Sequence, residues 1–409
     1  MTSFDTSPQL SVWRALLALG VVFVMLATTG WTALHSRRET TPLAASRAAW
    51  EHGRLHGHAL PDPTATSAAR LTRFFAALTA PEQTRLAHRY PLAVGNMNGA
   101  PVTLRYAANR IALGQARTVE LGRMHDSRLS PAGQYEAGRR MHRFGDLMAK
   151  GRHILAFDPE GPGRVAEVFG DLDRARRISV VVPGVDTDLL TFQRTNRRWS
   201  APVGMAQALY AAERSVAPAS RTAVIAWADY TAPSGIGMEA ATGVRAAEGS
   251  LRLNALLAAL PGRSDVGLFC HSYGSVVCGV AAHHLPGRVT DIAVAGSPGM
   301  RASKASGLGT RAQVWAMRDR TDWIQDVPYL EVGGLGHGAD PVSRAFGARV
   351  MSALDAQGHA GYFVPGTDSL RNFAEIGVGA YGSVRCAGSP GDNDTCRADL
   401  PGTTTAGRA

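Results

Sequence analysis

Apolar and polar positions follow two different patterns along this chain, and the change lies near residue 151. Within residues 67–150 apolar side chains recur at the spacing of an amphipathic helix, first at Leu71, Phe74 and Leu78. Beyond this point, short apolar runs such as 178–182 alternate with segments of ten or more residues that suit helices. The first pattern predicts a helical lead-in. The second predicts an α/β domain with a doubly wound, mostly parallel sheet.

The N-terminus carries a different signal, a run of 20 uncharged and mostly apolar residues at positions 15–34. At 1.5 Å per residue, a helix of this length crosses a hydrocarbon core of about 30 Å. We therefore expect a membrane anchor or an uncleaved signal segment, because Thr28-Thr29-Gly30 makes a poor cleavage site. Arg37 and Arg38 follow the run and favour a cytoplasmic location for that side.

These patterns divide the chain into five parts. Residues 1–35 are expected to form the signal or transmembrane segment, and 36–66, rich in Arg, Ala, Pro and Thr, a linker. The helical lead-in spans 67–150, the catalytic α/β domain 151–380, and a tail 381–409.

Two of the four cysteines argue against the cytoplasmic location. Cys386 and Cys396 enclose a short polar loop, the kind of loop that a disulfide closes in an oxidising compartment. We therefore expect a membrane-anchored or secreted protein with an extracytoplasmic body. Cys270 and Cys278 lie in apolar surroundings and are interpreted as buried thiols.

Charge and short motifs narrow the class of partner. The net charge of +10 comes almost wholly from arginine, yet no basic run interleaved with aromatic residues occurs, so we expect no nucleic-acid binding. The sequence has no His-Glu-x-x-His, no phosphate-binding Gly-x-x-x-x-Gly-Lys-Ser/Thr loop and no Gly-x-Gly-x-x-Gly after a strand. Neither a metal nor another cofactor is therefore expected.

One stretch, 266–277, predicts chemistry: an apolar strand, a sharp corner at Ser272, and a helix. This arrangement is typical of a nucleophile elbow, in which a strained turn raises a serine oxygen above the edge of a sheet. The positions two before and two after the serine must be small, and they are Cys270 and Gly274. The alternative is an ordinary turn in which Ser272 caps the helix.

A serine nucleophile needs a base and an acid that orients the base. Asp322 follows a predicted strand at 313–317 and is expected to be the acid, with Asp319 as the alternative. His359 follows the last predicted strand, 349–354, and is expected to be the base. The order serine, acid, histidine is that of the α/β-hydrolase fold.

Two other histidines and two backbone amides complete the expected site. His337 is the rival base, although it precedes the last strand, and His271 is expected to line the pocket. The N–H groups of Tyr273, after the nucleophile, and Val185, after Pro-Gly, are expected to form the oxyanion hole. The Pro-Gly-Val segment also suits an ordinary turn.

Several motifs resemble a largely uncharacterised family of serine α/β-hydrolases that is abundant in high-G+C bacteria. They are 95–101 (GNMNGAP), 108–110 (ANR), 182–187 (VPGVDT), 271–275 (HSYGS), 322–324 (DWI), 336–341 (GHGADP) and 358–363 (GHAGYF). The resemblance covers the last three quarters of the chain and implies the hydrolase fold, with Ser272, Asp322 and His359 as the triad. It implies no substrate, and Cys270 departs from the usual glycine.

The function expected from these observations is hydrolysis of a carboxylic ester, carried by a small molecule or a lipid, through an acyl-enzyme. An amidase, a peptidase or an acyltransferase would use the same triad. A non-catalytic body that serves as an interaction module of the cell envelope is the alternative of another class. The oligomeric state stays open.

Overall fold

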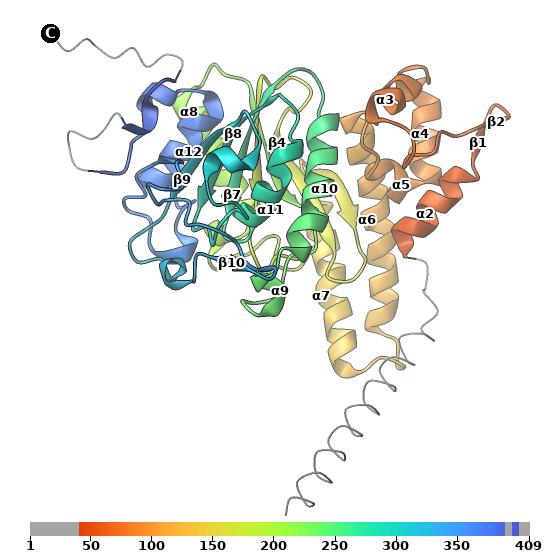
Figure 1. The fold of residues 1–409 in the computed structure, drawn as a ribbon. Coiled ribbons are helices and arrows are strands. Elements are labelled where there is room, and N and C mark those ends of the chain that lie inside the picture. Colours follow the sequence, from red (N-terminus) through yellow and green to blue (C-terminus); the bar gives the residue numbers. More distant parts are fainter. Residues whose placement is uncertain (1–40, 389–394, 401–409) are drawn as a thin grey trace, which may run out of the picture.

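The computed structural model describes residues 41–388 and 395–400, and its centre is an eight-stranded sheet (Figure 1). The strand order is β12-β9-β8-β7-β5-β6-β4-β3. Strands β5 to β9 and β12 pair in parallel, whereas β4 is antiparallel to β6 and β3 is antiparallel to β4. The strands are β3 (His153–Asp158), β4 (Arg164–Gly170), β5 (Arg177–Val182), β6 (Thr222–Ala228), β7 (Asp265–His271), β8 (Val289–Ala295), β9 (Gln313–Met317) and β12 (Arg349–Val350). The mostly parallel sheet predicted from the sequence is confirmed.

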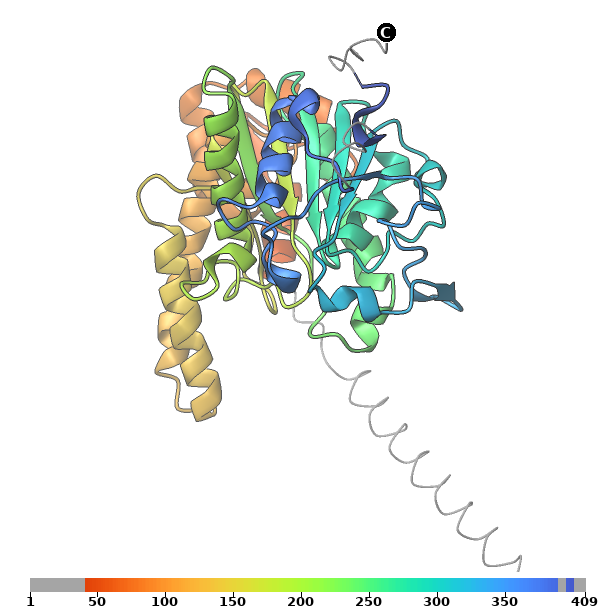
Figure 2. The ribbon, with the colours of Figure 1, turned by 90° about the vertical axis from the view of Figure 1, so that its left-hand side faces the viewer.

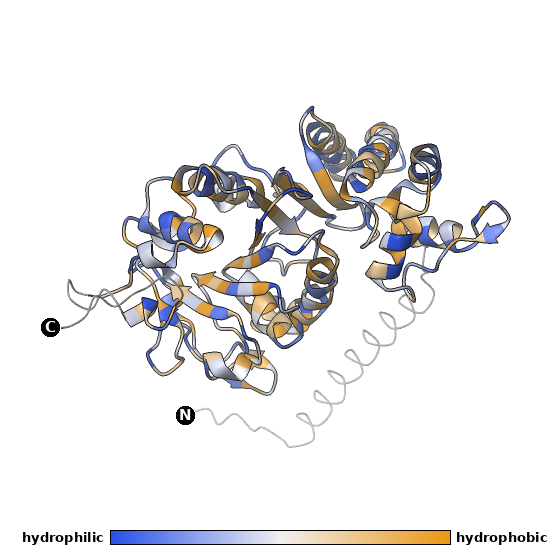
Figure 3. Ribbon diagram, turned by 90° about the horizontal axis from the view of Figure 1, so that it is seen from above, coloured by the Kyte–Doolittle hydropathy of each residue, from blue (hydrophilic) through white to orange (hydrophobic). Residues whose placement is uncertain are grey.

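Helices cover both faces of this sheet. Because successive side chains of a strand point to opposite faces, Val180 and Leu268 lie in one apolar cluster and Val181 and Phe269 in another. The first cluster packs under α10 (Val244–Ala259) and α11 (Gly274–Ala281), and the second under α8 (Pro202–Val216) and α12 (Asp368–Val378). Figure 3 shows the apolar strands between these helices. Burial on both faces explains why the strands are almost continuously apolar.

The N-terminal part is helical, as predicted, and packs beside β3. Its helices are α2 (Pro42–Glu51), α3 (Ala68–Ala76), α4 (Ala80–Arg89), α5 (Pro91–Gly95), α6 (Val102–Met124) and α7 (Pro131–Leu147). Helices α6 and α7 form a hairpin that projects beyond the α/β domain (Figures 1 and 2). Asn109 on α6 donates to the carbonyl of Ile154 on β3 over 2.9 Å, which ties the lead-in to the sheet.

The segment expected to be a linker, 36–66, differs from that expectation over its described residues. Residues 42–51 form α2, and a hairpin of β1 (Arg54–Leu55) and β2 (His58–Ala59) follows. Trp50 is fully buried against Phe75 and Tyr90, and its indole donates to the carbonyl of Pro61 over 2.8 Å. One buried indole therefore orders a segment whose composition alone resembles a linker.

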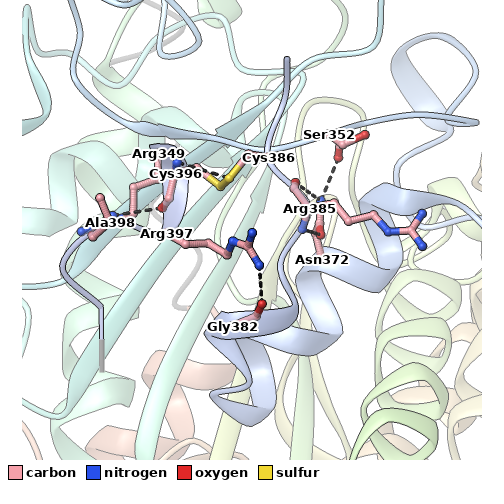
Figure 4. The surroundings of a disulfide bond; sticks show 9 residues. All are labelled: Arg349, Ser352, Asn372, Gly382, Arg385, Cys386, Cys396, Arg397 and Ala398. Carbon is pink, nitrogen blue, oxygen red and sulfur yellow. Dashed lines mark hydrogen bonds between the residues drawn. A yellow bond between two sulfur atoms is a disulfide. The ribbon is translucent and has the colours of Figure 1, made fainter. Parts of the chain in front are cut away.

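The last strand is shorter than the predicted 349–354. Only Arg349 and Val350 pair with β9, because the chain then turns away, and the Ser352 N–H donates to the carbonyl of Arg385 over 2.9 Å. Asn372 on α12 bridges both segments through the carbonyls of Ser352 and Arg385, each at 3.0 Å (Figure 4).

Two disulfides are present among the described residues. Cys386–Cys396 is confirmed, and Arg349 donates to the carbonyls of Cys396 and Ala398 beside it (Figure 4). The interpretation of Cys270 and Cys278 as thiols is wrong, because the two form a disulfide that joins β7 to α11. Both are fully buried, as expected. Their pairing depends on the elbow turn, which brings the two Cα atoms to 6.6 Å.

The apolar run at 15–34, expected to be a membrane anchor or signal, lies outside the described residues. Within 41–388 and 395–400, none of the helices combines the length and the apolar character that a membrane span requires.

Candidate active site

Ser272 lies at the end of β7, at the sharp corner before α11. Its φ of 53° is in the left-handed region that non-glycine residues rarely adopt, and its N–H donates to the carbonyl of Ala295 over 3.0 Å. A Cβ at Gly274 would lie only 2.2 Å from the carbonyl oxygen of Val182, so this position requires glycine. The strained corner and the close approach of strand and helix match a nucleophile elbow. The Ser272 side chain does not cap α11.

The Ser272 hydroxyl instead faces His359. The two atoms Ser272 Oγ and His359 Nε2 are 2.8 Å apart, and His359 Nδ1 lies 2.9 and 3.1 Å from the two carboxylate oxygens of Asp322. A carboxylate at Nδ1 requires the proton on that nitrogen, which leaves Nε2 as the acceptor for the Ser272 O–H. Ser272, His359 and Asp322 thus form one hydrogen-bonded series, the arrangement that a serine nucleophile with a base and an orienting acid would require.

Asp322 is fully buried and held by two further donors. Tyr362 donates its hydroxyl to Oδ2 over 2.5 Å, and the N–H of Ile324 donates to Oδ1 over 2.9 Å. Burial by itself raises the pKa of Asp322, but the hydrogen bonds from His359, Tyr362 and Ile324 outweigh it and lower the pKa below its usual range. Asp322 is therefore ionised at neutral pH and accepts hydrogen bonds from His359.

His271 contacts the backbone of His359. Its Nε2 lies 2.6 Å from the backbone carbonyl oxygen of His359, to which it donates, and the two rings are 4.9 Å apart. Burial lowers the pKa of His271 to about 3, so this imidazole stays neutral. It lies beside the site, as expected, and its hold on the loop of His359 was not predicted. Trp323, whose ring lies 4.8 Å from that of His359, was likewise missed as a neighbour of the base.

The two alternates do not join this arrangement. Asp319 accepts from the N–H of Thr321 and the N–H of Gly358, each at 3.0 Å, and so holds the loop that precedes His359. His337 is buried, and its Nε2 lies 2.7 Å from the carbonyl oxygen of Ala240. Its ring packs edge-on against Tyr273.

The turn that carries Val185 passes directly beside Ser272. A Cβ added at Gly184 would lie 2.6 Å from the Ser272 Cβ. The Tyr230 hydroxyl fixes the turn by donating to the carbonyl of Pro183 over 2.7 Å. Across the described residues, the N–H groups of Val185 and Tyr273 donate to no other group of the protein. Both amides are therefore available to an oxyanion.

A cavity of about 180 Å³ opens at this point, lined by the turn from Pro183 to Thr187, by Ser272 and by His359. Thr191 and Arg194 add polar side chains to its wall. In the described part of the chain, no group of three or more His, Cys, Asp or Glu side chains converges as metal ligands. Among the side chains that line this cavity are the hydroxyl of Ser272 and the imidazole of His359.

Comparison with known proteins identifies one domain of this chain. Residues 158–332 match a family model described as alpha/beta hydrolase. This chain contains an α/β-hydrolase domain. The match covers the strands from β4 to β9, the elbow and Asp322, and the resemblance inferred from the motifs is confirmed.

Proteins of similar sequence occur in mycobacteria. An uncharacterised protein of Mycobacterium tuberculosis is 26% identical over 404 residues, which cover 83% of this chain and 60% of that protein. An uncharacterised protein of Mycobacterium bovis is 34% identical over 145 residues, or 34% of this chain and 54% of that protein. The α/β-hydrolase chain thus spans little more than half the length of the curated relatives that it matches.

Solved structures of hydrolases are similar over part of the chain. A serine hydrolase without a lid from Xanthomonas campestris has 14% identity and a TM-score of 0.31, covering 59% of this chain and 98% of that one. A putative alpha/beta hydrolase from Agrobacterium tumefaciens has 9% identity and a TM-score of 0.28, covering 42% and 72%.

Proposed function

We propose that this α/β-hydrolase is a serine hydrolase that cleaves carboxylic esters through an acyl-enzyme. One observation carries the proposal: His359 Nε2 lies 2.8 Å from Ser272 Oγ while Asp322 holds His359 Nδ1. A serine hydroxyl is a weak nucleophile at neutral pH, so a base at hydrogen-bond distance is what makes it reactive.

The reaction begins when His359 removes the Ser272 proton and Oγ attacks the ester carbonyl carbon. The carbonyl π bond opens, and the resulting oxyanion accepts hydrogen bonds from the N–H groups of Tyr273 and Val185. Removing one donor of this kind raises the activation free energy by on the order of 3 kcal/mol. His359 then gives its proton to the departing alcohol, which leaves an acyl group on Ser272.

Water completes the cycle by the same route. His359 takes a proton from the water, whose oxygen attacks the acyl carbon, and then returns a proton to Ser272 Oγ as the carboxylic acid leaves. In both halves Asp322 stabilises the imidazolium, which its lowered pKa supports because the group stays ionised at neutral pH. Amidase and acyltransferase activities would need only a different leaving group or a different acceptor.

Labelling with a fluorophosphonate, which reacts with activated serines, tests the proposal. The folded wild-type protein should be labelled, Ser272→Ala should not, and Ser234→Ala, an exposed serine in the loop after β6, should be labelled like the wild type. His359→Ala should abolish labelling, whereas His337→Ala should preserve it. If folded wild-type protein resists the probe, the chain is instead a non-catalytic interaction module.

Substrate panels then separate the activities that share this triad. Hydrolysis of esters of increasing acyl length, of the matching amides, and transfer to added alcohols would be compared on one preparation. With a cavity of about 180 Å³ beside Ser272, we expect short acyl groups to react fastest. Faster turnover of amides than of esters would reject the esterase assignment.

We also propose an extracytoplasmic catalytic body. Both disulfides support this location, because reducing cytosol disfavours such bonds. Titration of denatured, unreduced protein isolated from its source should find no free thiol. Four free thiols in that protein would place it in a reducing compartment.

A further inference from the structure

Large apolar side chains are exposed in loops at the edge of the sheet that carries the site. In this domain the carboxyl ends of the parallel strands form the edge at which Ser272, Asp322 and His359 meet. Ile236 and Met238 after β6 and Val332 after β9 reach exposures of 75%, 69% and 69% at this same edge. We call the following set the apolar rim: Ile236, Met238, Trp323, Leu330, Val332 and Leu335.

The elements that carry the rim residues are held together by contacts within the protein. Helix α9 (Met238–Ala241) is joined to the hairpin of β10 (Glu331–Val332) and β11 (Leu335–Gly336) through a bridge between Thr242 and Leu335. Arg301 fastens the hairpin by donating to the carbonyl of Gly336 over 3.1 Å and by pairing with Glu331. Because soluble surfaces seldom gather exposed apolar side chains on one face, a fixed rim of this kind indicates a partner.

A second apolar set lies on the α6–α7 hairpin. Val119 near the end of α6 and Tyr135 in the second turn of α7 are 60% and 71% exposed. The tip of this hairpin, α9 and β10 lie on the same lower side of the molecule in both Figure 1 and Figure 2, two views at right angles. Two exposed apolar sets on separate elements at one side of the molecule suit an extended, flat partner.

The sequence indicates which flat partner this is. The apolar run 15–34 is long enough to enter a bilayer, and only residues 35–41 separate it from the start of α2 at Pro42. Seven extended residues span at most about 25 Å. A chain held in a bilayer by that run therefore keeps the start of α2 within about 25 Å of the lipid.

We infer that the apolar rim and the α6–α7 hairpin rest on the lipid bilayer that holds the chain's N-terminal run, with the mouth of the Ser272 site facing the lipid. Side chains such as Val332 and Met238 enter the boundary between headgroups and acyl chains, and their burial drives the contact. Resting on the proposed function, the substrate is an ester that lies at the membrane interface, because its carbonyl reaches Ser272 from that plane.

Depth-sensitive labelling tests the docking without any reference to catalysis. Full-length protein is reconstituted into phosphatidylcholine vesicles, with one introduced cysteine carrying the fluorophore NBD at Met238→Cys, Val332→Cys or Tyr135→Cys. The matched control is Val216→Cys, an exposed site at the end of α8, at the opposite edge of the sheet. The three test sites should show blue-shifted emission and loss of intensity with brominated acyl chains. Val216 should show neither.

Two results would overturn the inference. In the first, the rim labels behave like the Val216 label in vesicles. In the second, the emission of the rim labels shifts to the blue in detergent solution that contains no vesicles, and this shift disappears when the protein is diluted. That result would mean that a second copy of the chain covers the rim.

Activity separates this inference from the proposed function. In a Met238→Asp/Val332→Asp variant, the ratio of hydrolysis of a vesicle-embedded ester to hydrolysis of a dissolved ester should fall, while Val216→Asp should keep the wild-type ratio. An unchanged ratio in the double variant counts against docking. Docked labels in a protein that hydrolyses neither ester would leave the membrane contact standing and reject the esterase.

Discussion

Replacing Gly184 by alanine tests how closely the oxyanion turn must approach the nucleophile. The added Cβ would lie 2.6 Å from Cβ and 3.0 Å from Oγ of Ser272, and 3.2 Å from the carbonyl oxygen of His271. Carbon atoms in ordinary contact are about 3.5–4.0 Å apart, so the turn and the serine must separate by about 1 Å. That displacement lengthens the path from Oγ to the amide of Val185.

A misplacement of about 1 Å in a catalytic constellation lowers the rate by roughly 10²-fold. We therefore expect Gly184→Ala to reduce kcat for a dissolved ester by about two orders of magnitude, or about 2.7 kcal/mol in activation free energy. The rate of fluorophosphonate labelling should fall in parallel, since both reactions need Ser272 in place. Circular dichroism and a thermal melt would establish that the variant is folded.

The control for this experiment is Gly237→Ala, in the loop after β6. No atom lies within 4 Å of a Cβ added there, so its kinetics should match those of the wild type. If folded Gly184→Ala keeps a rate within a few fold of the wild type, the turn is not the oxyanion element that we propose.

Three further predictions concern the acid, a buried carboxyl and the tail. Asp322→Asn should lower kcat by roughly 10⁴-fold because an amide favours the wrong tautomer of His359, and a loss no larger than that of Asp319→Asn would reject this role. Burial raises the pKa of Glu213 to about 8 from 4.5, so the folded chain keeps a proton that the unfolded chain releases, and stability should fall as pH rises through this window. Glu213→Gln should flatten that slope in melts at pH 5 and pH 9, and parallel wild-type and variant profiles would contradict it. Cys386→Ser/Cys396→Ser should cost about 3 kcal/mol in urea unfolding, since the disulfide closes a short loop, and an unchanged midpoint would show that the tail adds no stability.

The elbow could be predicted because its signal is local. An apolar strand, a serine between two small residues and a helix occupy twelve consecutive positions, 266–277. The strained φ of Ser272 and the close approach at Gly274 are consequences of that short stretch. Asp322 and His359 could be predicted as candidate site residues for a different reason. Each follows a predicted parallel strand, and side chains that follow neighbouring parallel strands meet at one edge of the sheet.

Other features could not be predicted, because they depend on contacts between distant segments. The hydrogen bond from His271 to the backbone of His359 joins residues 88 apart in the chain. Helix α2 was missed because its order comes from Trp50, whose partners Phe75 and Tyr90 lie in other helices. The Cys270–Cys278 disulfide could not be predicted, because the distance between the two residues depends on the elbow turn and is not given by the composition.

The amino-acid pattern is enough to predict the parallel sheet, the sharp turn at Ser272 and the positions of Asp322 and His359 after successive strands, because these follow from local periodicity and from the rules of connection between strands. The tertiary structure places His359, and not His337, beside Ser272, and it leaves Ile236, Met238 and Val332 exposed. Both outcomes rest on long-range packing. Residues far apart in the chain become neighbours only when the core between them has formed.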